Sequence, residues 1–304
     1  MGPAPTWNGL FVGEGFRPPG LDVLMHMPGR DYLLEDTEVR LLLEGVLQWY
    51  GFDFRHYAPE ILKRRLWERI DAEGLRTISG YQEKLLHDEG CLEHLLLALS
   101  GTGTRPCIFH DPGFYQALRT TVVPVLRTYA SAQVWLPACS TGEEAYAVAI
   151  VFREEGLSQR CRVYATDISE VVLKTAREGL FPLTALQDAT ANYVKAGGAR
   201  AFSEYYTVQD DRVVMDAALR ESIVFAEHHL ATDGSFNEFQ VIMCRNAMGL
   251  FNEWLQERVH ELFLKSLSRF GLLLLGEKEN PKLPWNQESY ELLEGPHTLY
   301  RKMN

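Results

Sequence analysis

The chain has 304 residues, of which 46% are hydrophobic, and its formal net charge at pH 7 is -11. A chain of this length can bury a large core, and we expect two domains rather than one. No apolar run reaches the ~18 residues that a membrane span needs, and the acidic balance disfavours general nucleic-acid binding. The first residues lack a basic region followed by an apolar one, so we expect no secretory signal.

The cysteines favour a cytoplasmic protein without a metal site. They are five in number, and no two have the C-x-x-C spacing of zinc ligands. An odd number without such spacing is typical of reduced thiols rather than of a disulfide framework.

Glycine and proline divide the first third of the chain. Residues 1–30 are rich in both and lack periodicity, so we expect an irregular extension there. Residues 31–104 repeat apolar residues at i, i+3, i+4 and i+7, which predicts a small domain of short helices. The predicted breaks between these helices are the glycines Gly51, Gly74, Gly80 and Gly90.

The remainder, residues 105–304, alternates short apolar strands with amphipathic helices. This alternation predicts βαβ units and an α/β domain built on a parallel sheet. The predicted strands are 134–138, 162–166, 241–244 and 271–276. The predicted helices are 113–128, 142–155, 169–178 and 253–269.

A small antiparallel β-subdomain is expected at about 193–226, inserted in this α/β domain. Two β-rich segments, 205–215 and 222–226, support it. Asp210 and Asp211 are good turn residues and divide the first segment into the two strands of a hairpin.

The loop after the first predicted strand, A-C-S-T-G at 138–142, has almost no side-chain bulk, so a ligand can approach its main chain. Ser140 or Thr141 can cap the following helix. Glu143 and Glu144 complement its positive end, and they disfavour a phosphate and favour a cationic or zwitterionic ligand. In the simpler interpretation the two glutamates are only helix-start residues.

Asp167 follows the next strand, where a carboxylate can bind both hydroxyls of a ribose. A nucleoside-containing cofactor is therefore expected. NAD fits poorly, because the loop has one glycine instead of G-x-G-x-x-G. S-adenosylmethionine fits better, because it carries an ammonium, a sulfonium and a ribose but no phosphate.

Four ordered blocks point to a family. They are C-S-T-G-E-E-A-Y at 139–146, A-T-D-I at 165–168, A-R-E-G-L-F-P at 176–182 and C-R-N at 244–246. In these blocks the chain resembles the CheR-type chemotaxis receptor methyltransferases, as a divergent member, from about Leu41 to Lys302. The resemblance implies a Rossmann-like S-adenosylmethionine-dependent methyltransferase domain with an N-terminal helical domain and an inserted β-subdomain.

The resemblance also implies the roles of individual residues in forming methyl esters on receptor glutamates. Catalytic roles at the substrate side are expected of Arg245 and His110. Contacts to S-adenosylmethionine, or to its product S-adenosylhomocysteine, are expected of Ala138, Glu143, Asp167, His229, Leu230, Asn246 and Arg245. A structural salt bridge is the alternative interpretation of Arg245.

The sequence departs from the family pattern at four positions. His110 stands where an arginine is usual, Pro106 replaces a threonine, and Leu250 replaces a tyrosine. His229 stands where an asparagine usually precedes the leucine that contacts adenine. Two alternatives therefore stay open: a catalytically weakened module that binds the cofactor and regulates a partner, and a methyltransferase for a different carboxylate.

One predicted helix is basic in an otherwise acidic chain, through Lys63, Arg64, Arg65 and Arg69. A charge run is usually a solvated face. The resemblance instead implies that this helix docks an acidic coiled-coil receptor, with salt-dependent steering. We expect the protein to act as a monomer, without nucleic acid and without inserting into a membrane.

Overall fold

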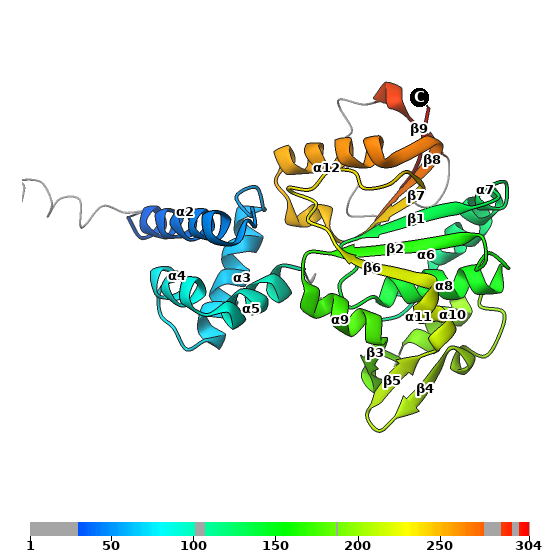
Figure 1. Ribbon diagram of the computed structural model, residues 1–304, viewed down its shortest axis with the longest axis horizontal. Helices are drawn as coiled ribbons and strands as arrows, with labels where there is room; N and C mark the ends of the chain where they lie inside the picture. The colour runs from blue at the N-terminus through cyan, green and yellow to red at the C-terminus, as the bar shows by residue number, and fades with distance from the viewer. Residues whose placement is uncertain (1–29, 101–106, 187, 277–286, 294–297, 304) are drawn as a thin grey trace, which may run out of the picture.

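The computed structural model describes residues 30–100, 107–186, 188–276, 287–293 and 298–303. It shows a group of helices beside a larger α/β part (Figure 1). The predicted extension at 1–30 lies outside the described residues except for Arg30, and so does Pro106. Among the described residues, none of the helices combines the length and the hydrophobicity that a membrane span requires.

The predicted helical domain is present. Its helices are α2 (Arg30–Tyr50), α3 (Pro59–Ala72), α4 (Ile78–His87) and α5 (Glu89–Ser100). Gly51 and Gly74 follow α2 and α3 with φ of 82° and 69°, the left-handed region that favours glycine. The predicted breaks at Gly80 and Gly90 are wrong, because both lie inside helices. Gly80 donates its N–H to the hydroxyl of the N-cap Thr77, so it starts a helix instead of ending one.

The α/β part is built on a seven-stranded sheet in the order β6-β2-β1-β7-β8-β10-β9. Pairs from β6 to β8 are parallel, and β10 pairs antiparallel with β8 and with β9. The strands are β1 (Ala132–Pro137), β2 (Cys161–Asp167), β6 (Ile223–Glu227), β7 (Phe239–Cys244), β8 (Leu267–Leu275), β9 (Tyr290–Leu293) and β10 (Thr298–Lys302). This arrangement confirms the predicted α/β fold class.

Both faces of the sheet are covered, as in other parallel sheets. Side chains alternate along β1, so Val134 and Leu136 pack in one apolar core while Trp135 packs in another. The first core includes α8 (Glu143–Glu154). The second core includes α12 (Glu253–Ser266) and continues into the helical domain, so the two parts share it. Figure 1 shows α12 on one side of the sheet and α8 and α9 (Glu170–Glu178) on the other.

A separate three-stranded antiparallel sheet forms the β-subdomain. Its order is β3-β5-β4, with β3 (Leu180–Pro182), β4 (Tyr206–Gln209) and β5 (Arg212–Met215). Asp210 turns the predicted hairpin with φ of 52°. The predicted limits of 193 and 226 need correction, because β3 precedes them and β6 pairs with β2 in the large sheet.

Shorter elements complete the chain. The helical ones are α7 (Val123–Leu126), α10 (Ala189–Lys195) and α11 (Ala217–Ser222), and the single-turn ones are η2 (Leu183–Leu186), η3 (Phe202–Tyr205), η4 (Met248–Leu250) and η6 (Gln287–Ser289). The helix predicted at 113–128 is divided, because a π-helical turn η1 (Leu118–Val122) separates α6 (Pro112–Ala117) from α7.

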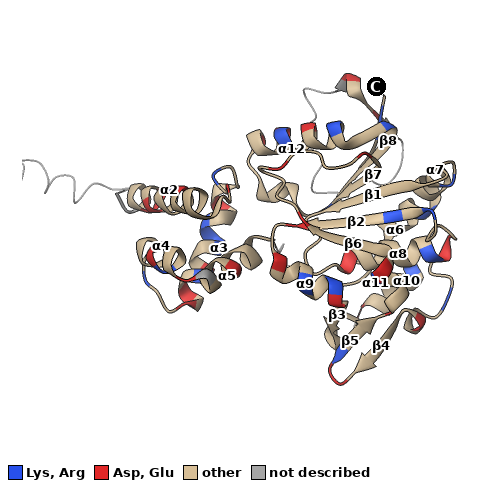
Figure 2. Ribbon diagram, in the orientation of Figure 1, with Lys and Arg blue, Asp and Glu red and all other residues tan. Residues whose placement is uncertain are grey.

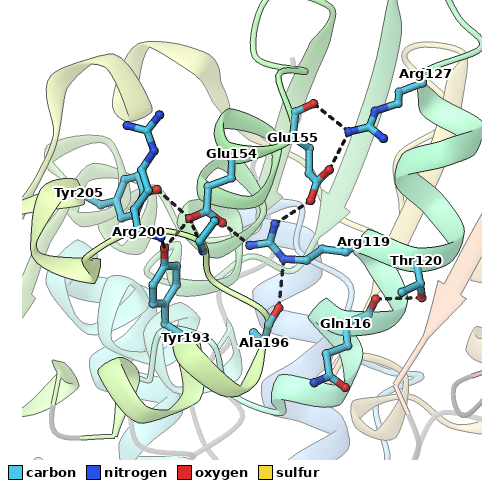
Figure 3. Close-up of polar contacts among 11 residues, drawn as sticks. Gln116, Arg119, Thr120, Arg127, Glu154, Glu155, Tyr193, Ala196, Arg200 and Tyr205 are labelled. Atoms are coloured by element: carbon cyan, nitrogen blue, oxygen red, sulfur yellow. Dashed lines mark hydrogen bonds and ion pairs between the residues drawn. The ribbon is translucent and has the colours of Figure 1, made fainter.

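A buried carboxylate ties the β-subdomain to α8 (Figure 3). Glu154 at the end of α8 accepts hydrogen bonds from the hydroxyls of Tyr193 and Tyr205 and pairs with Arg119 on η1. Its side chain is 2% exposed, so these donors replace the water that it loses. Arg119 also pairs with Glu155 at 2.9 Å and donates to the Ala196 carbonyl.

Candidate functional site

The candidate site lies where the chain order of the parallel strands reverses. β1 lies between β2 and β7, and ligands of such sheets bind beyond the carboxyl ends of the strands at this point. A pocket opens there between the helical domain and the α/β part. It is lined by Tyr57, Leu99, Ser100, Ala138, Asp167, Ile168, His228, His229, Leu230, Leu250 and Phe251.

The structure brings some predicted site residues together and leaves others apart. Ala138, Asp167, His229 and Leu230 share the pocket lining. The other predicted residues are not among the lining residues, namely His110, Glu143, Arg245 and Asn246.

Asp167 is the buried carboxylate of the pocket. Its side chain ends β2, is 1% exposed, and accepts the backbone N–H groups of Ser140 at 2.9 Å and Ser169 at 3.1 Å. Burial raises its pKa to about 6, although these backbone donors lower it. An ionised carboxylate has about four acceptor positions. The backbone N–H groups of Ser140, Ser169 and Ile168 all lower its pKa as donors, so about one acceptor position is left for a donor from the pocket.

His229 and Leu230 follow β6 and are buried. Neither ring nitrogen of His229 has a hydrogen-bond partner among the described residues. Burial lowers the pKa of His229 to about 4, so the imidazole is neutral at pH 7 and carries one donor and one acceptor. A buried polar ring without partners at a pocket wall fits a ligand that supplies them.

The glycine loop differs from the expectation in detail. Gly142 is the N-cap of α8, with φ of 92° and no side-chain cap, so the predicted caps by Ser140 or Thr141 are wrong. A Cβ at Gly142 would lie 3.1 Å from the Cβ of Ala176. The glycine is therefore required for packing against α9.

Glu143 begins α8 and accepts a hydrogen bond of 2.5 Å from the Thr141 hydroxyl. Burial raises the pKa of Glu143. The groups that lower this pKa are hydrogen-bond donors, and none of them is a cation. A cationic ligand would compensate the charge of Glu143.

Arg245 follows β7 and is already paired. Its side chain is 6% exposed, and its guanidinium lies 4.1 Å from the centre of the Phe114 ring. One terminal nitrogen lies 3.1 Å from the Asp111 carboxylate, and the other lies 3.4 Å from the Glu144 carboxylate. Burial raises the pKa of Glu144, and Arg245 lowers it in part. Two carboxylates thus share one cation.

His110 and Asn246 flank this cluster with exposed side chains. The backbone carbonyl of His110 accepts a hydrogen bond of 3.4 Å from Arg245. Asn246 has a left-handed backbone with φ of 57°, a conformation that asparagine tolerates better than most residues.

The predicted basic docking face on α3 needs correction. Lys63 pairs with Glu35 and Asp36, and Arg69 pairs with Glu73. Arg65 is buried and donates to the Ala98 carbonyl at 2.5 Å. Figure 2 shows acidic residues on the helices around α3. Only Arg64 of the four remains well exposed, beside Glu68 at 3.8 Å.

Several pocket residues escaped the sequence interpretation. Tyr57, Leu99 and Ser100 belong to the helical domain and reach the pocket from the opposite side. No local motif marks them, because their role arises only when the two parts pack together. Among the described residues no group of His, Cys, Asp and Glu side chains could hold a metal ion.

Comparison with known proteins gives a consistent answer. The family model "CheR methyltransferase, SAM binding domain" matches residues 107–299, and "CheR methyltransferase, all-alpha domain" matches residues 37–100. Cher3 of Pseudomonas putida is 41% identical over 267 residues, which cover 88% of this chain and 97% of Cher3. A chemotaxis protein methyltransferase of Salmonella typhimurium is 27% identical, with 85% of this chain and 88% of the relative covered.

The pocket fits the cofactor of that family. Asp167 in the pocket wall is a buried acceptor, His229 beside it has an unpartnered donor and acceptor, and Glu143, at the start of α8 and outside the pocket lining, lacks a cation. S-adenosylmethionine carries a ribose, a purine and an ammonium group that match these three needs. The chain belongs to the CheR methyltransferase family and is an S-adenosylmethionine-dependent methyltransferase.

Proposed function

We propose that this enzyme forms methyl esters on glutamate side chains of a chemoreceptor-like protein. The observation that carries the proposal is the pocket at the ends of β1 and β2, with the buried Asp167 carboxylate in its wall. Chemotaxis methyltransferases among the relatives support the substrate class.

Each predicted cofactor contact keeps a place in this proposal. Asp167 accepts a hydrogen bond from the ribose, and His229 with Leu230 contacts the adenine. Glu143 offsets the ammonium group, and the backbone at Ala138 lies against the cofactor. Asn246 and Arg245 border the end where donor and substrate meet. Bound S-adenosylmethionine supplies an electrophilic methyl group on a sulfonium.

The protein has little acid–base chemistry to perform. A glutamate with an ordinary pKa of about 4.3 is already ionised at neutral pH, so its nucleophilic oxygen needs no general base. What remains is to remove water and to hold the carboxylate within about 3–3.5 Å of the methyl carbon. Positioning groups are therefore the residues that matter on the substrate side.

Arg245 and His110 are those groups. A guanidinium can hold a carboxylate by two parallel hydrogen bonds. Because Arg245 already contacts Asp111 and Glu144, the substrate carboxylate must displace one of them or add to the pair. The exposed His110 side chain is next to Asp111 in the chain and can donate a hydrogen bond to the substrate carboxylate.

Transfer of a labelled methyl group to a receptor cytoplasmic fragment tests the proposal. Base-labile label on the fragment is the expected product, because carboxyl esters hydrolyse in alkali. Arg245→Lys keeps the charge but loses the planar fork, and we expect at least a tenfold lower kcat/KM. Label that resists alkali would refute carboxylate chemistry.

A second function is favoured by the pairing of Arg245. If Asp111 and Glu144 hold the guanidinium permanently, the chain binds the cofactor and regulates a partner without transfer. Normal binding of S-adenosylhomocysteine with no ester on any receptor fragment supports this alternative. Methyl transfer to a different carboxylate, with no methyl transfer to receptor fragments, supports the remaining alternative, a methyltransferase with another carboxylate substrate.

The partner and the setting complete the proposal. We propose a cytoplasmic monomer that meets an acidic coiled-coil receptor. Among the described residues none of the five cysteines forms a disulfide, which supports a reducing compartment. Of the four basic residues on α3, Arg64 has the most exposed side chain, and its ion pair with the equally exposed Glu68 is long at 3.8 Å, so docking through the other three basic residues is not part of the proposal.

A further inference from the structure

The ring of His229 is held by the helical domain as well as by the α/β part. Phe52 and Phe54 lie in the loop between α2 and α3, and their ring centres lie 6.0 and 5.7 Å from that of His229. The two phenyl rings are stacked, with an angle of 11° between their planes. Phe54 is fully buried and also contacts Tyr57, which lines the pocket.

The loop that carries these phenylalanines is fixed to the α/β part close by. Ala58 donates its N–H to the Leu250 carbonyl at 2.8 Å, and Asn252 donates to the His56 carbonyl at 2.9 Å. The His56 ring lies over Trp254, with 4.0 Å between ring centres. These contacts join the two parts directly beside the pocket, so a displacement of the loop would move Phe52 and Phe54 against His229.

His229 is a pocket residue with both ring nitrogens left to whatever fills the pocket. It is 7% exposed, and both ring nitrogens are without partners among the described residues. The charged or titratable groups that act on the ring are Asp233, Asp53 and His228. Asp233 binds the backbone N–H of His229 at 2.8 Å and leaves the ring nitrogens open.

We propose that Phe52 and Phe54 are positioning residues that fix the His229 ring for the base of the bound cofactor. The helical domain thereby sets cofactor affinity, although neither phenylalanine belongs to the predicted cofactor site. This inference rests on the proposed placement of adenine at His229. We call Phe52 and Phe54 the hydrophobic clamp. Under this inference the clamp, together with the α/β motifs, determines the affinity for the cofactor.

A consequence concerns the partner. Linkage requires that, if the position of the helical domain changes cofactor affinity by some factor, the cofactor changes the affinity of any ligand of that domain by the same factor. A receptor segment on α2 or α3 that favours the cofactor-binding position of the helical domain would therefore bind more tightly to the cofactor-loaded enzyme.

A double-mutant cycle on the full chain tests the clamp. S-adenosylhomocysteine is titrated by calorimetry into the wild type, Phe54→Leu, His229→Ala and the double variant. Loss of one well-oriented hydrogen bond predicts that Phe54→Leu weakens binding about 3- to 10-fold. In the His229→Ala background the same change should alter the Kd less than twofold, because the clamp acts through the ring.

Tyr81→Leu is the matched control, because Tyr81 is fully buried in the helical domain and has no ring contact with His229 among the described residues. It should lower the melting temperature and leave the Kd unchanged. If Phe54→Leu does not fold, Phe52→Leu takes its place, since Phe52 is only half-buried.

A readout in the absence of cofactor complements the cycle. Phe54→Leu opens the packing around His229, so NMR of the ring should show its pKa rising from about 4 toward the ordinary 6.5. An equal loss of affinity in both backgrounds, or an unchanged Kd and ring pKa in a folded variant, overturns the inference. These measurements need no methyl acceptor, so they are independent of whether receptor glutamates are the substrate.

Discussion

Replacing Asp167 by asparagine is the sharpest test of the cofactor site, because the change keeps the shape and removes the charge. The carboxylate is 1% exposed, and burial raises its pKa from 3.8 to about 6. A raised pKa in the folded state means that its contribution to stability is fully present below pH 3.8 and is lost as the pH rises through 6. Two pKa units correspond to roughly 3 kcal/mol of lost stability at pH 7.

Asparagine removes this electrostatic cost but loses one acceptor for the two backbone donors. Leaving one buried N–H of Ser140 or Ser169 unsatisfied costs about 1–3 kcal/mol. The two effects nearly cancel or leave a small gain. Asp167→Asn should therefore be at least as stable as the wild type at pH 7, and less stable than it near pH 4, in urea unfolding without cofactor.

Cofactor binding should move in the opposite direction. The variant loses a hydrogen bond from a ribose hydroxyl to a charged acceptor, worth about 1.5–3 kcal/mol, or roughly a 10- to 150-fold weaker Kd. For the wild type, calorimetry with S-adenosylhomocysteine should show constant affinity above pH 6 and a fall of up to tenfold per pH unit below it.

Glu227→Gln serves as the control, because Glu227 at the end of β6 also has a raised pKa but lies outside the pocket lining and has no role in the proposed cofactor site. It should keep the break near pH 6. An Asp167→Asn variant that binds as tightly as the wild type, with the same pH profile, would refute the role given to this carboxylate.

Four further substitutions test the packing around the site and the surface of α3, the first three by thermal unfolding of the full chain. Glu154→Ala removes the buried acceptor in Figure 3 and should destabilise by about 3–5 kcal/mol; a loss below 1 kcal/mol would contradict it. Gly142→Ala forces a side chain toward Ala176 at a φ of 92°, and we expect a loss of about 1–3 kcal/mol. Arg65→Ala should destabilise the helical domain, whereas Arg64→Glu should leave the melting point unchanged and weaken receptor binding at low salt.

The sequence predicted most of the large sheet, because its signal is local. Short apolar strands and amphipathic helices each fit within one window, and β1, β2 and β7 lie within a few residues of their predicted places. Boundaries set by tertiary contacts were harder to predict. β8 begins at Leu267, inside a predicted helix, because its first residue pairs with Phe239 across a register shift.

Charge runs misled the interpretation of α3 for the same reason. Lys63 looks free in a local window, but its carboxylate partner Glu35 is 28 residues away. Arg65 reads as one more surface cation, yet the carbonyl that it binds belongs to α5. A helix packed against other helices has only part of its surface in solvent, and the sequence does not say which part.

In the candidate site the sequence motifs could be recognised, but the backbone conformation of the loops could not be predicted. Most non-glycine residues with a left-handed backbone lie in the loops of the site, namely Phe109, Asp111, Ala138, Ser140 and Asn246. Such conformations cost about 1–3 kcal/mol each and persist only where the surroundings impose them. Here the surroundings include the Ser140 N–H bound to Asp167 and the Asp111 carboxylate bound to Arg245. Alanine, serine and phenylalanine do not favour this conformation, so no propensity argument could find it. The local backbone preferences of these residues are overridden where the loops meet at Asp167 and Arg245. This disagreement between sequence preference and structure indicates the functional edge of the sheet independently of any motif.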